Sequence, residues 1–341
     1  MYDVSTVGLD IAKQIFHAHG VDSAGSVLFR KKLRRHEVLG FFSQLPRCLV
    51  GIEACATSHH WARQLRAIGH EVRLMPATYV KPYVKRQKND AADAEAICEA
   101  VTRPTMRFVP IKSEEQQGLL MLHRGRELLI RQRTMTINAL RAHLAELGIV
   151  ARQGDVGVQS LLGLVRQEGS DSLPSMVRAA LLPLVHQIEQ TTAKISAFDL
   201  EIQVWHRQNE TSRRLASVPG IGPITASAII ATITDVSTFR RGREFSAWLG
   251  LVPRQSSSGG KDRLGAITKK GDAYLRRLLV VGALSALRVS RTNESRGIPG
   301  AARLLERKPY KLAAIALANK MARIVWALLT TGERFKLQPR A

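Results

Sequence analysis

The sequence contains few cysteines and no spacing that would organise them. Cys48, Cys55 and Cys98 are an odd number, lie among apolar residues and do not form a C-x-x-C pair. A disulfide framework needs paired cysteines, and a cysteine zinc site needs close ligand spacing. We therefore exclude a disulfide-stapled domain and a thiolate zinc site, and expect three reduced core residues.

The sequence also lacks a long apolar run, an internal repeat and a low-complexity tract. No segment approaches the roughly 18 uninterrupted apolar residues of a membrane span. Met1 is not followed by the basic and then apolar residues of a signal peptide. We expect no membrane partner and a cytoplasmic protein.

Acidic residues are scarce relative to basic ones. The 341 residues include 51 Lys and Arg against 28 Asp and Glu, a net charge of +23, and residues 211–341 hold 24 against 7, or +17 of that total. Such a field attracts polyanions. A merely well-solvated basic face is the alternative, but the uneven distribution favours nucleic acid as the partner and the C-terminal region as its main phosphate-binding surface.

The first 111 residues have the pattern of an α/β domain. Helical spacing of apolar residues occurs at 36–45 and 58–69. Short β-prone runs bounded by Gly, Asp or charged residues occur at 4–11, 14–21, 26–33, 48–54 and 71–77. The order of three strands, helix, strand, helix, strand predicts hairpin-linked first strands and crossover-linked later ones.

Helical patterns dominate the rest of the chain. One predicted helix spans 112–147, where Ile130, Ile137 and Leu144 repeat every seven residues and Leu140 and Leu147 are offset by three, as on a coiled-coil seam. A second spans 176–209, can be interrupted at Pro183, and can pack antiparallel to the first. The segment 150–175 shows no clear period. We place domain boundaries to give residues 1–111, 112–209 and 210–341.

Four acidic residues form the main candidate site. Asp10 and Glu53 each end a predicted strand in an apolar frame, whereas Asp90 and Asp93 share one face of a predicted helix. Four carboxylates within ~5 Å would repel by about 3 kcal/mol per pair. Hard oxygen ligands suit Mg²⁺ or Mn²⁺, and two such ions can clamp a phosphodiester. Individually, the same acids could cap a turn, pair with lysine or decorate a solvated helix.

Cations precede that helix and recur in the C-terminal region. The predicted phosphate contacts beside the acids are Lys81, Lys85, Arg86 and Lys88, with a solvated loop as the alternative. Helices are expected at 267–288 and 311–329, suited to the core and an oligomer interface. The start of the first of these helices carries a further basic surface of Lys269, Lys270, Arg276 and Arg277.

Two glycine-containing loops are candidate phosphate sites in the basic region. Gly220 and Gly222 lie in a P-G-I-G turn like that of a helix-hairpin-helix, which exposes amides at a helix start; the glycines would equally let two helices approach closely. Residues 254–265 are a Ser/Gly loop with Arg254, Lys261 and Arg263. A serine there could attack a phosphodiester, but chemistry alone favours simple phosphate binding and leaves Ser256, Ser257 and Ser258 equivalent.

Five ordered motifs carry a resemblance to a known family over nearly the whole chain. They are GLDIAK at 8–13, GIEA at 51–54, KNDAADA at 88–94, VPGIG at 218–222, and WLGLVPRQSSSGGK at 248–261 followed by ITKKGDAYLR at 267–276. The sequence resembles bacterial transposases of the insertion-sequence one-ten family, and more closely its eleven-eleven subgroup.

The resemblance implies an N-terminal RuvC-like, RNase H-type domain whose DEDD acids are Asp10, Glu53, Asp90 and Asp93. It further implies a helical coiled-coil insertion and a C-terminal helical transposase domain. Members are recombinases guided by a structured non-coding RNA, called a bridge or seek RNA, that pairs with donor and target DNA. They act as tetramers in which a serine of another subunit completes the site. That serine matches Ser258, with Ser257 one residue away.

The leading hypothesis is therefore RNA-guided, site-specific DNA recombination, with Mg²⁺ held by the four acids and Ser258 attacking the scissile phosphate. A hydrolytic Holliday-junction resolvase using the same acids is the second hypothesis. The third is a basic nucleic-acid-binding protein in which the acids are structural.

Overall fold

The computed structural model describes residues 3–85, 90–167, 173–256, 263–292, 298 and 300–336. The chain divides into two compact units, Met1–Ser113 and Glu114–Ala341. Each unit has its own hydrophobic core. The division of the second unit into a helical and a basic domain at residue 210 stays a prediction.

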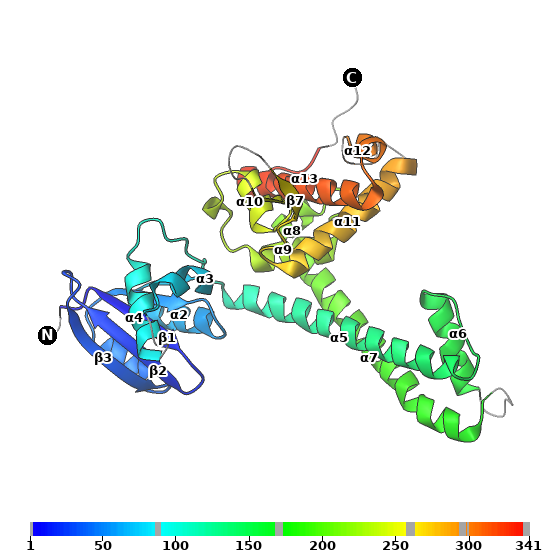
Figure 1. Ribbon diagram of the computed structural model, residues 1–341, viewed down its shortest axis with the longest axis horizontal. Coiled ribbons are helices and arrows are strands. Elements are labelled where there is room, and N and C mark those ends of the chain that lie inside the picture. Colours follow the sequence, from blue (N-terminus) through cyan, green and yellow to red (C-terminus); the bar gives the residue numbers. More distant parts are fainter. Residues whose placement is uncertain are drawn as a thin grey trace. The chain divides into compact units, whose positions relative to one another are not determined.

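The first unit is a mixed α/β fold (Figure 1). Its strands are β1 (Thr6–Ile11), β2 (Ile15–Val21), β3 (Val27–Arg34), β4 (Leu49–Glu53) and β5 (Glu71–Met75). Its helices are α1 (Val38–Ser43), α2 (Ser58–Ala67), α3 (Ala77–Val80), the short 3-10 turn η1 (Lys81–Tyr83) and α4 (Asp90–Val101). The α/β prediction is confirmed, and each strand begins and ends within two residues of its predicted segment.

The five strands form one sheet in the order β3-β2-β1-β4-β5. The first three pair antiparallel through hairpins, whereas β4 and β5 join parallel to β1 through crossover helices. Side chains alternate between the two faces of a strand. Val7 and Leu9 are fully buried in the core that includes Trp61 of α2, and the intervening Gly8 faces α4. The sheet is thus covered on both faces.

The described residues of the second unit are helical apart from one small hairpin and the connecting loops. Its elements are α5 (Glu114–Ala145), α6 (Asp155–Arg166), α7 (Ser175–Gln208), α8 (Glu210–Leu215), α9 (Pro223–Thr232), the 3-10 turn η2 (Val236–Thr238), α10 (Gly242–Trp248), β6 (Pro253–Gln255), β7 (Leu264–Ile267), α11 (Ala273–Thr292), α12 (Ala301–Arg307) and α13 (Tyr310–Thr331).

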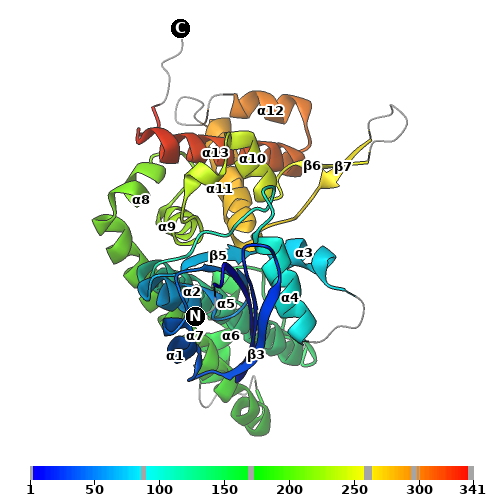
Figure 2. The same cartoon turned by 90° about the vertical axis from the view of Figure 1, so that its left-hand side faces the viewer.

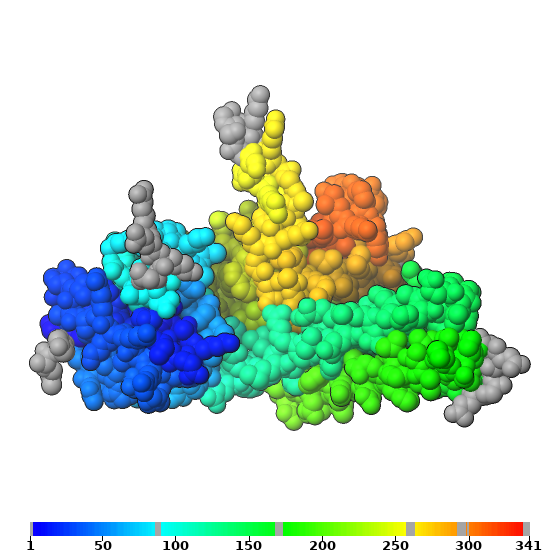
Figure 3. Space-filling view, turned by 60° about the horizontal axis from the view of Figure 1, so that its bottom comes forward, coloured from blue at the N-terminus to red at the C-terminus, as the bar shows by residue number. Residues whose placement is uncertain are grey.

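Helices α5 and α7 lie side by side and antiparallel (Figures 1 and 3). The start of α5 meets the end of α7 through the Glu115–Trp205 hydrogen bond, and the far ends share a core with Leu144 and Leu181. The interruption that Pro183 allowed does not occur, because the neighbouring packing offsets the loss of one amide donor. Leu147, expected on the seam, lies beyond the end of α5 and is exposed.

Two patterns were misread from the sequence. Residues 155–166, within the segment without a clear period, form α6, which packs its buried leucines against α7. The residues that flank the centre of the Ser/Gly loop form the antiparallel pair β6–β7, which projects from the surrounding helices (Figure 2), and the helix expected from 267 begins at Ala273. Exposed strands of three and four residues carry too little alternation for the sequence to reveal them.

Helix α13 forms the centre of the second unit's core. By length and composition alone it is apolar enough to cross a membrane, and it is the one such helix in the described part of the chain. The same composition is typical of a buried core helix. Leu317, Met321 and Val325 are fully buried against residues of α9, α10 and α11, so packing within the unit accounts for this apolar character.

A buried polar contact joins α5 to the C-terminal helices. The ring of His123 is fully buried; Nδ1 lies 3.0 Å from the Tyr274 hydroxyl and Nε2 lies 3.0 Å from Ser227 Oγ. Burial, reinforced by Arg126 and Arg124, lowers the pKa of His123 to about 4. The neutral ring is therefore a satisfied structural link between α5, α9 and α11.

Candidate metal centre

Two of the four predicted acids lie side by side near the ends of adjacent strands. In the parallel pairing of β1 with β4, Leu9 stands opposite Ile52, so Asp10 and Glu53 come one residue further along each strand. Gly8 precedes Asp10 by two residues, and Gly51 precedes Glu53 by two. Because strand side chains alternate with a period of two, each acid projects from the face that its glycine occupies.

That face is covered by α4, which carries the other two acids. A Cβ on Gly8 would lie 2.1 Å from the carbonyl oxygen of Ala94, and one on Gly51 would lie 2.8 Å from Val101 Cβ. Only glycine permits such a close approach of helix and sheet. The N-terminal end of α4, with Asp90 and Asp93 in its first turn, is thereby held over the end of β1.

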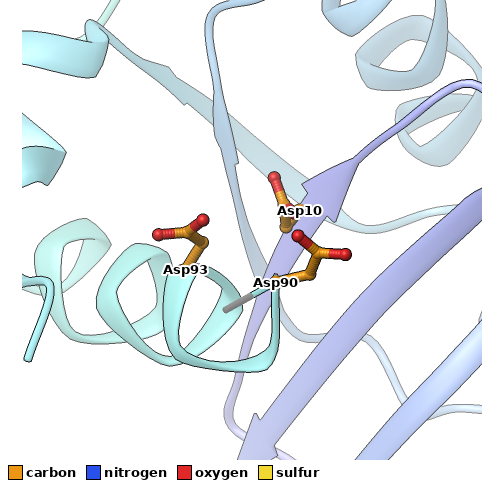
Figure 4. A group of neighbouring side chains, drawn as sticks. All are labelled: Asp10, Asp90 and Asp93. Atoms are coloured by element: carbon orange, nitrogen blue, oxygen red, sulfur yellow. The ribbon is translucent and has the colours of Figure 1, made fainter. Parts of the chain in front are cut away.

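The three aspartates converge. Each of Asp10, Asp90 and Asp93 offers a carboxylate oxygen, and these atoms all lie within 4.8 Å of one another. Figure 4 shows Asp10 rising from the strand toward the two helix carboxylates. Among the described residues, a group this tight contains these three acids and not Glu53, although the charge of Glu53 acts on Asp10.

The electrostatics of this cluster are unfavourable without a cation. Burial, together with the negative charges of Asp93, Asp90 and Glu53, raises the pKa of Asp10 from 3.8 to about 6. Desolvation and like-charge repulsion are the two general reasons why a carboxylate retains its proton. A bound divalent cation reverses both, and carboxylate oxygens at this spacing fit Mg²⁺ or Mn²⁺. The residues present therefore fit the metal.

His17 is a neighbour of the cluster that the sequence did not reveal. It pairs with Asp10 across the β1–β2 hairpin, and its Nδ1 lies 3.8 Å from an Asp90 carboxylate oxygen. Within the described part of the chain, this buried nitrogen has no hydrogen-bond partner. Only the hairpin register brings His17 beside the acids, and residue type alone gives no sign of that register.

The cations expected beside the acids differ in their surroundings. Lys85 forms an ion pair with Glu95 of α4, as does Arg30 of β3. Lys81 is exposed at the start of η1. Arg86 and Lys88 lie outside the described residues. Lys85 must therefore exchange its contact with Glu95 if it is to hold a phosphate.

The predicted turn glycines have a packing role in the second unit. Gly220 adopts φ +87°, and a Cβ there would lie 2.3 Å from the carbonyl oxygen of Gly282 in α11. Gly222 precedes Pro223, the first residue of α9. The close approach of Gly220 to Gly282 is the alternative that the sequence left open, and phosphate binding by either glycine stays a prediction.

Ser256 is the first of the three serines and directly follows β6. Ser256 donates its amide to the carbonyl of Arg263 across the hairpin, and Arg254 and Arg263 are exposed. Ser257, Ser258 and Lys261 lie outside the described residues, so the choice of nucleophile stays a prediction.

The remaining basic residues near α11 are partly engaged. Arg276 donates to the carbonyls of Leu249 and Lys270, and Arg277 pairs with Glu127 at 2.9 Å. Lys269 has φ +54°, a conformation outside the usual range for a lysine. Lys269 and Lys270 are exposed and available to a ligand, whereas Arg276 serves the backbone around it.

Comparison with known proteins finds relatives that match almost the entire chain. Residues 7–149 match the DEDD model described as "Transposase", and residues 212–296 match the "Transposase IS116/IS110/IS902 family". A protein of Pseudomonas aeruginosa named "Probable family 20 transposase" is 48% identical over 96% of this chain and 97% of its own length.

Two further relatives have names that specify an insertion sequence. The transposase for insertion sequence element IS1328 of Yersinia enterocolitica is 39% identical, covering 98% of this chain and 99% of its own. The transposase for IS1111A of Coxiella burnetii is 36% identical over 98% of this chain and 92% of its own. These relatives match the chain over nearly its whole length.

Proposed function

Because the chain belongs to the IS110 family of transposases and is thus a DNA-processing enzyme, we propose that it recombines DNA through a composite site of four acids and one serine. The observation that carries the proposal is the convergence of Asp10, Asp90 and Asp93 from strand and helix to within 4.8 Å. The order of the sheet and the acids at its strand ends support a RuvC-like, RNase H-type domain.

Asp10, Asp90 and Asp93 would hold Mg²⁺ or Mn²⁺, with Glu53 at the adjacent strand end as the fourth acid. When bound, the metal supplies a Lewis acid that offsets the charge developing on a phosphate. The acids themselves would hold the metal in position beside that phosphate. Gly8 and Gly51 keep α4 close enough to the sheet for the acids to act together.

Ser258 is the proposed nucleophile. Its hydroxyl loses a proton as its oxygen forms a bond to phosphorus, the bond from phosphorus to a sugar oxygen breaks, and the departing oxygen takes up a proton. Arg254, Lys261 and Arg263 neutralise the phosphate around it. Strand exchange followed by the reverse reaction rejoins DNA without net hydrolysis, which moves the protein's own insertion sequence.

The wider assignment extends the family resemblance. We propose a structured bridge or seek RNA as guide, donor and target DNA as substrates, a homotetramer as the active form, and a cytoplasmic location. The net charge of +17 on residues 211–341 supports binding of these polyanions. The antiparallel pair α5–α7 is the proposed coiled-coil insertion, and the turn before α9 is the proposed helix-hairpin-helix element.

Strand cleavage by the guide-loaded protein on supercoiled donor and target DNA tests this proposal. We expect cleavage in Mg²⁺, none in excess EDTA, and none with Ser258→Ala. Full recombination in EDTA would remove the metal from the mechanism. RNA that copurifies with the protein, once sequenced, should pair with DNA flanking the gene.

Two alternatives give different outcomes in the same assay. A hydrolytic Holliday-junction resolvase keeps most activity in Ser258→Ala and yields no covalent protein–DNA product. A non-catalytic binding protein shows the same background cleavage in Asp10→Asn as in the parent.

A further inference from the structure

A basic hollow lies between α10 and α13 and includes none of the predicted site residues. It measures about 280 Å³ and is lined by Arg241, Gly242, Arg243, Arg323, Trp326 and Ala327; we call it the arginine hollow. Gly242 lies at the contact of the two helices, because a Cβ there would lie 3.2 Å from Arg323 Cα. The absence of a side chain lets α10 press against α13, which brings together arginines 80 residues apart in sequence.

The arginine hollow carries an excess of positive charge. Arg241, Arg243 and Arg323 are exposed. Glu244 lies 3.7 Å from Arg241 and accepts a hydrogen bond from the Arg240 amide, so it offsets one of these charges. The excess extends along α13, where Arg323 adds to burial in lowering the pKa of Lys320.

The floor of the arginine hollow is fixed. Trp326 donates its indole N–H to the Phe239 carbonyl at 3.0 Å, which sets the orientation of the ring. Guanidinium groups match phosphate oxygens in a planar, bidentate manner and lose little hydration on doing so. The three exposed arginines beside the fixed Trp326 ring therefore offer guanidinium groups to phosphate oxygens.

We propose that the arginine hollow binds backbone phosphates of a nucleic acid and so anchors that nucleic acid on α10 and α13. The inference rests on the proposed function, which supplies DNA and RNA as partners. An open hollow with exposed arginines at its rim suits a polymer that continues past it. Both DNA and RNA offer this phosphate chemistry, and the experiment separates them.

The test is the salt dependence of binding by the full-length protein. We compare the parent with Arg241→Gln/Arg243→Gln/Arg323→Gln, using fluorescence anisotropy with a DNA duplex and with a structured RNA at several salt concentrations. Each lost phosphate contact reduces the slope of log K against log salt by about 0.9 for duplex DNA and about 0.7 for single strands. We expect a slope reduced by about 2 to 3 and an affinity reduced on the order of 100-fold near physiological salt.

A charge-matched control separates local contact from loss of general attraction. Arg131, Arg303 and Arg307 are also exposed and lie on α5 and α12; their triple change to glutamine removes the same charge. A change confined to the RNA or to the DNA supports the proposal and identifies the source of the phosphates. Equal slopes in parent and hollow variant, or equal losses in both triple variants, overturn it.

Two measurements keep the result interpretable. Arg323→Gln alone should reduce the slope by about 0.9 if the triple variant fails to fold, and an unchanged slope in this single variant counts against the proposal. The proposed function is tested separately, because it is judged from strand cleavage by Asp10→Asn and not from the salt slopes of binding. Failure of the catalytic assignment would leave the anchoring result unchanged.

Discussion

The carboxylate cluster of the first unit and the arginine hollow of the second gather like charges in similar ways. Gly8 lets α4 approach β1, and Gly242 lets α10 approach α13. In both places backbone packing, rather than attraction between the side chains, brings the charges together. Each region is therefore proposed to bind a ligand of opposite sign, a divalent cation in one and a phosphate in the other.

The two regions differ in burial. Asp10 is half-buried, and desolvation is the largest cause of its raised pKa. The arginines of the hollow are exposed, so water and salt already screen their repulsion. Because of this difference, we expect loss of the cation to change the activity and stability of the first unit more than loss of the phosphate changes those of the second.

The largest expected effect is on catalysis. Asp93→Asn should reduce strand cleavage by on the order of 10³-fold, since losing a metal ligand removes several kcal/mol of charge stabilisation. Glu99→Gln is the matched control, because Glu99 lies on the same helix and pairs with Arg103 at the surface. Gel quantification of cleaved DNA measures both. Comparable activity in Asp93→Asn and Glu99→Gln would place the metal chemistry elsewhere.

The next effect is on the packing that gathers the acids. Gly8→Ala should destabilise the first unit by about 3 kcal/mol, because the new methyl group meets the backbone of α4. Hydrogen exchange of β1 and α4 peptides, followed by mass spectrometry, measures the loss of protection. Gly40→Ala is the control: its site on α1 is open, and alanine favours a helix by up to about 1 kcal/mol. Equal protection in both variants would show that α4 does not depend on Gly8.

Metal and pH should act together on stability. With the pKa of Asp10 at about 6 in the folded state against an ordinary 3.8, the folded protein keeps a proton that the unfolded chain has lost. Stability of the metal-free protein should therefore fall as pH rises through that interval. Mg²⁺ needs the ionised carboxylates, so its stabilisation, about 1–2 kcal/mol at 10 to 30 times Kd, should grow with pH.

Thermal unfolding with Mg²⁺ or EDTA, below and above this interval, checks the linkage. Asp10→Asn should remove most of the pH dependence of the difference in thermal stability between Mg²⁺ and EDTA. The linkage to Asp10 is wrong if the variant keeps the full response.

The smallest effect concerns the arginine hollow. Raising NaCl should stabilise the parent by less than about 1 kcal/mol, because salt screens exposed charges. The hollow triple variant should show a weaker response than the Arg131, Arg303 and Arg307 control. Hydrogen exchange of α13 peptides localises the change. If salt changes hydrogen exchange at α13 as much in the hollow variant as in the parent, the three arginines do not repel one another measurably.

The sequence was sufficient for the parts that depend on local pattern. The five strands follow from runs such as 48–54, and the pairing of acids with glycines two residues earlier is visible in GLD and GIE. It was insufficient for contacts set by register and packing. His17 reaches Asp90 only through the β1–β2 pairing, and Arg323 reaches Gly242 only through α10 and α13.

Spacing of two residues has a consequence for building such a centre on another scaffold. Gly8 and Asp10 share one side of a ribbon because pleating alternates, and so do Gly51 and Glu53. One residue inserted between either glycine and its acid would turn the carboxylate to the opposite side, away from α4. Transfer of the centre to another protein therefore requires both Gly-x-acid segments with their spacing unchanged, together with the helix that packs on both glycines.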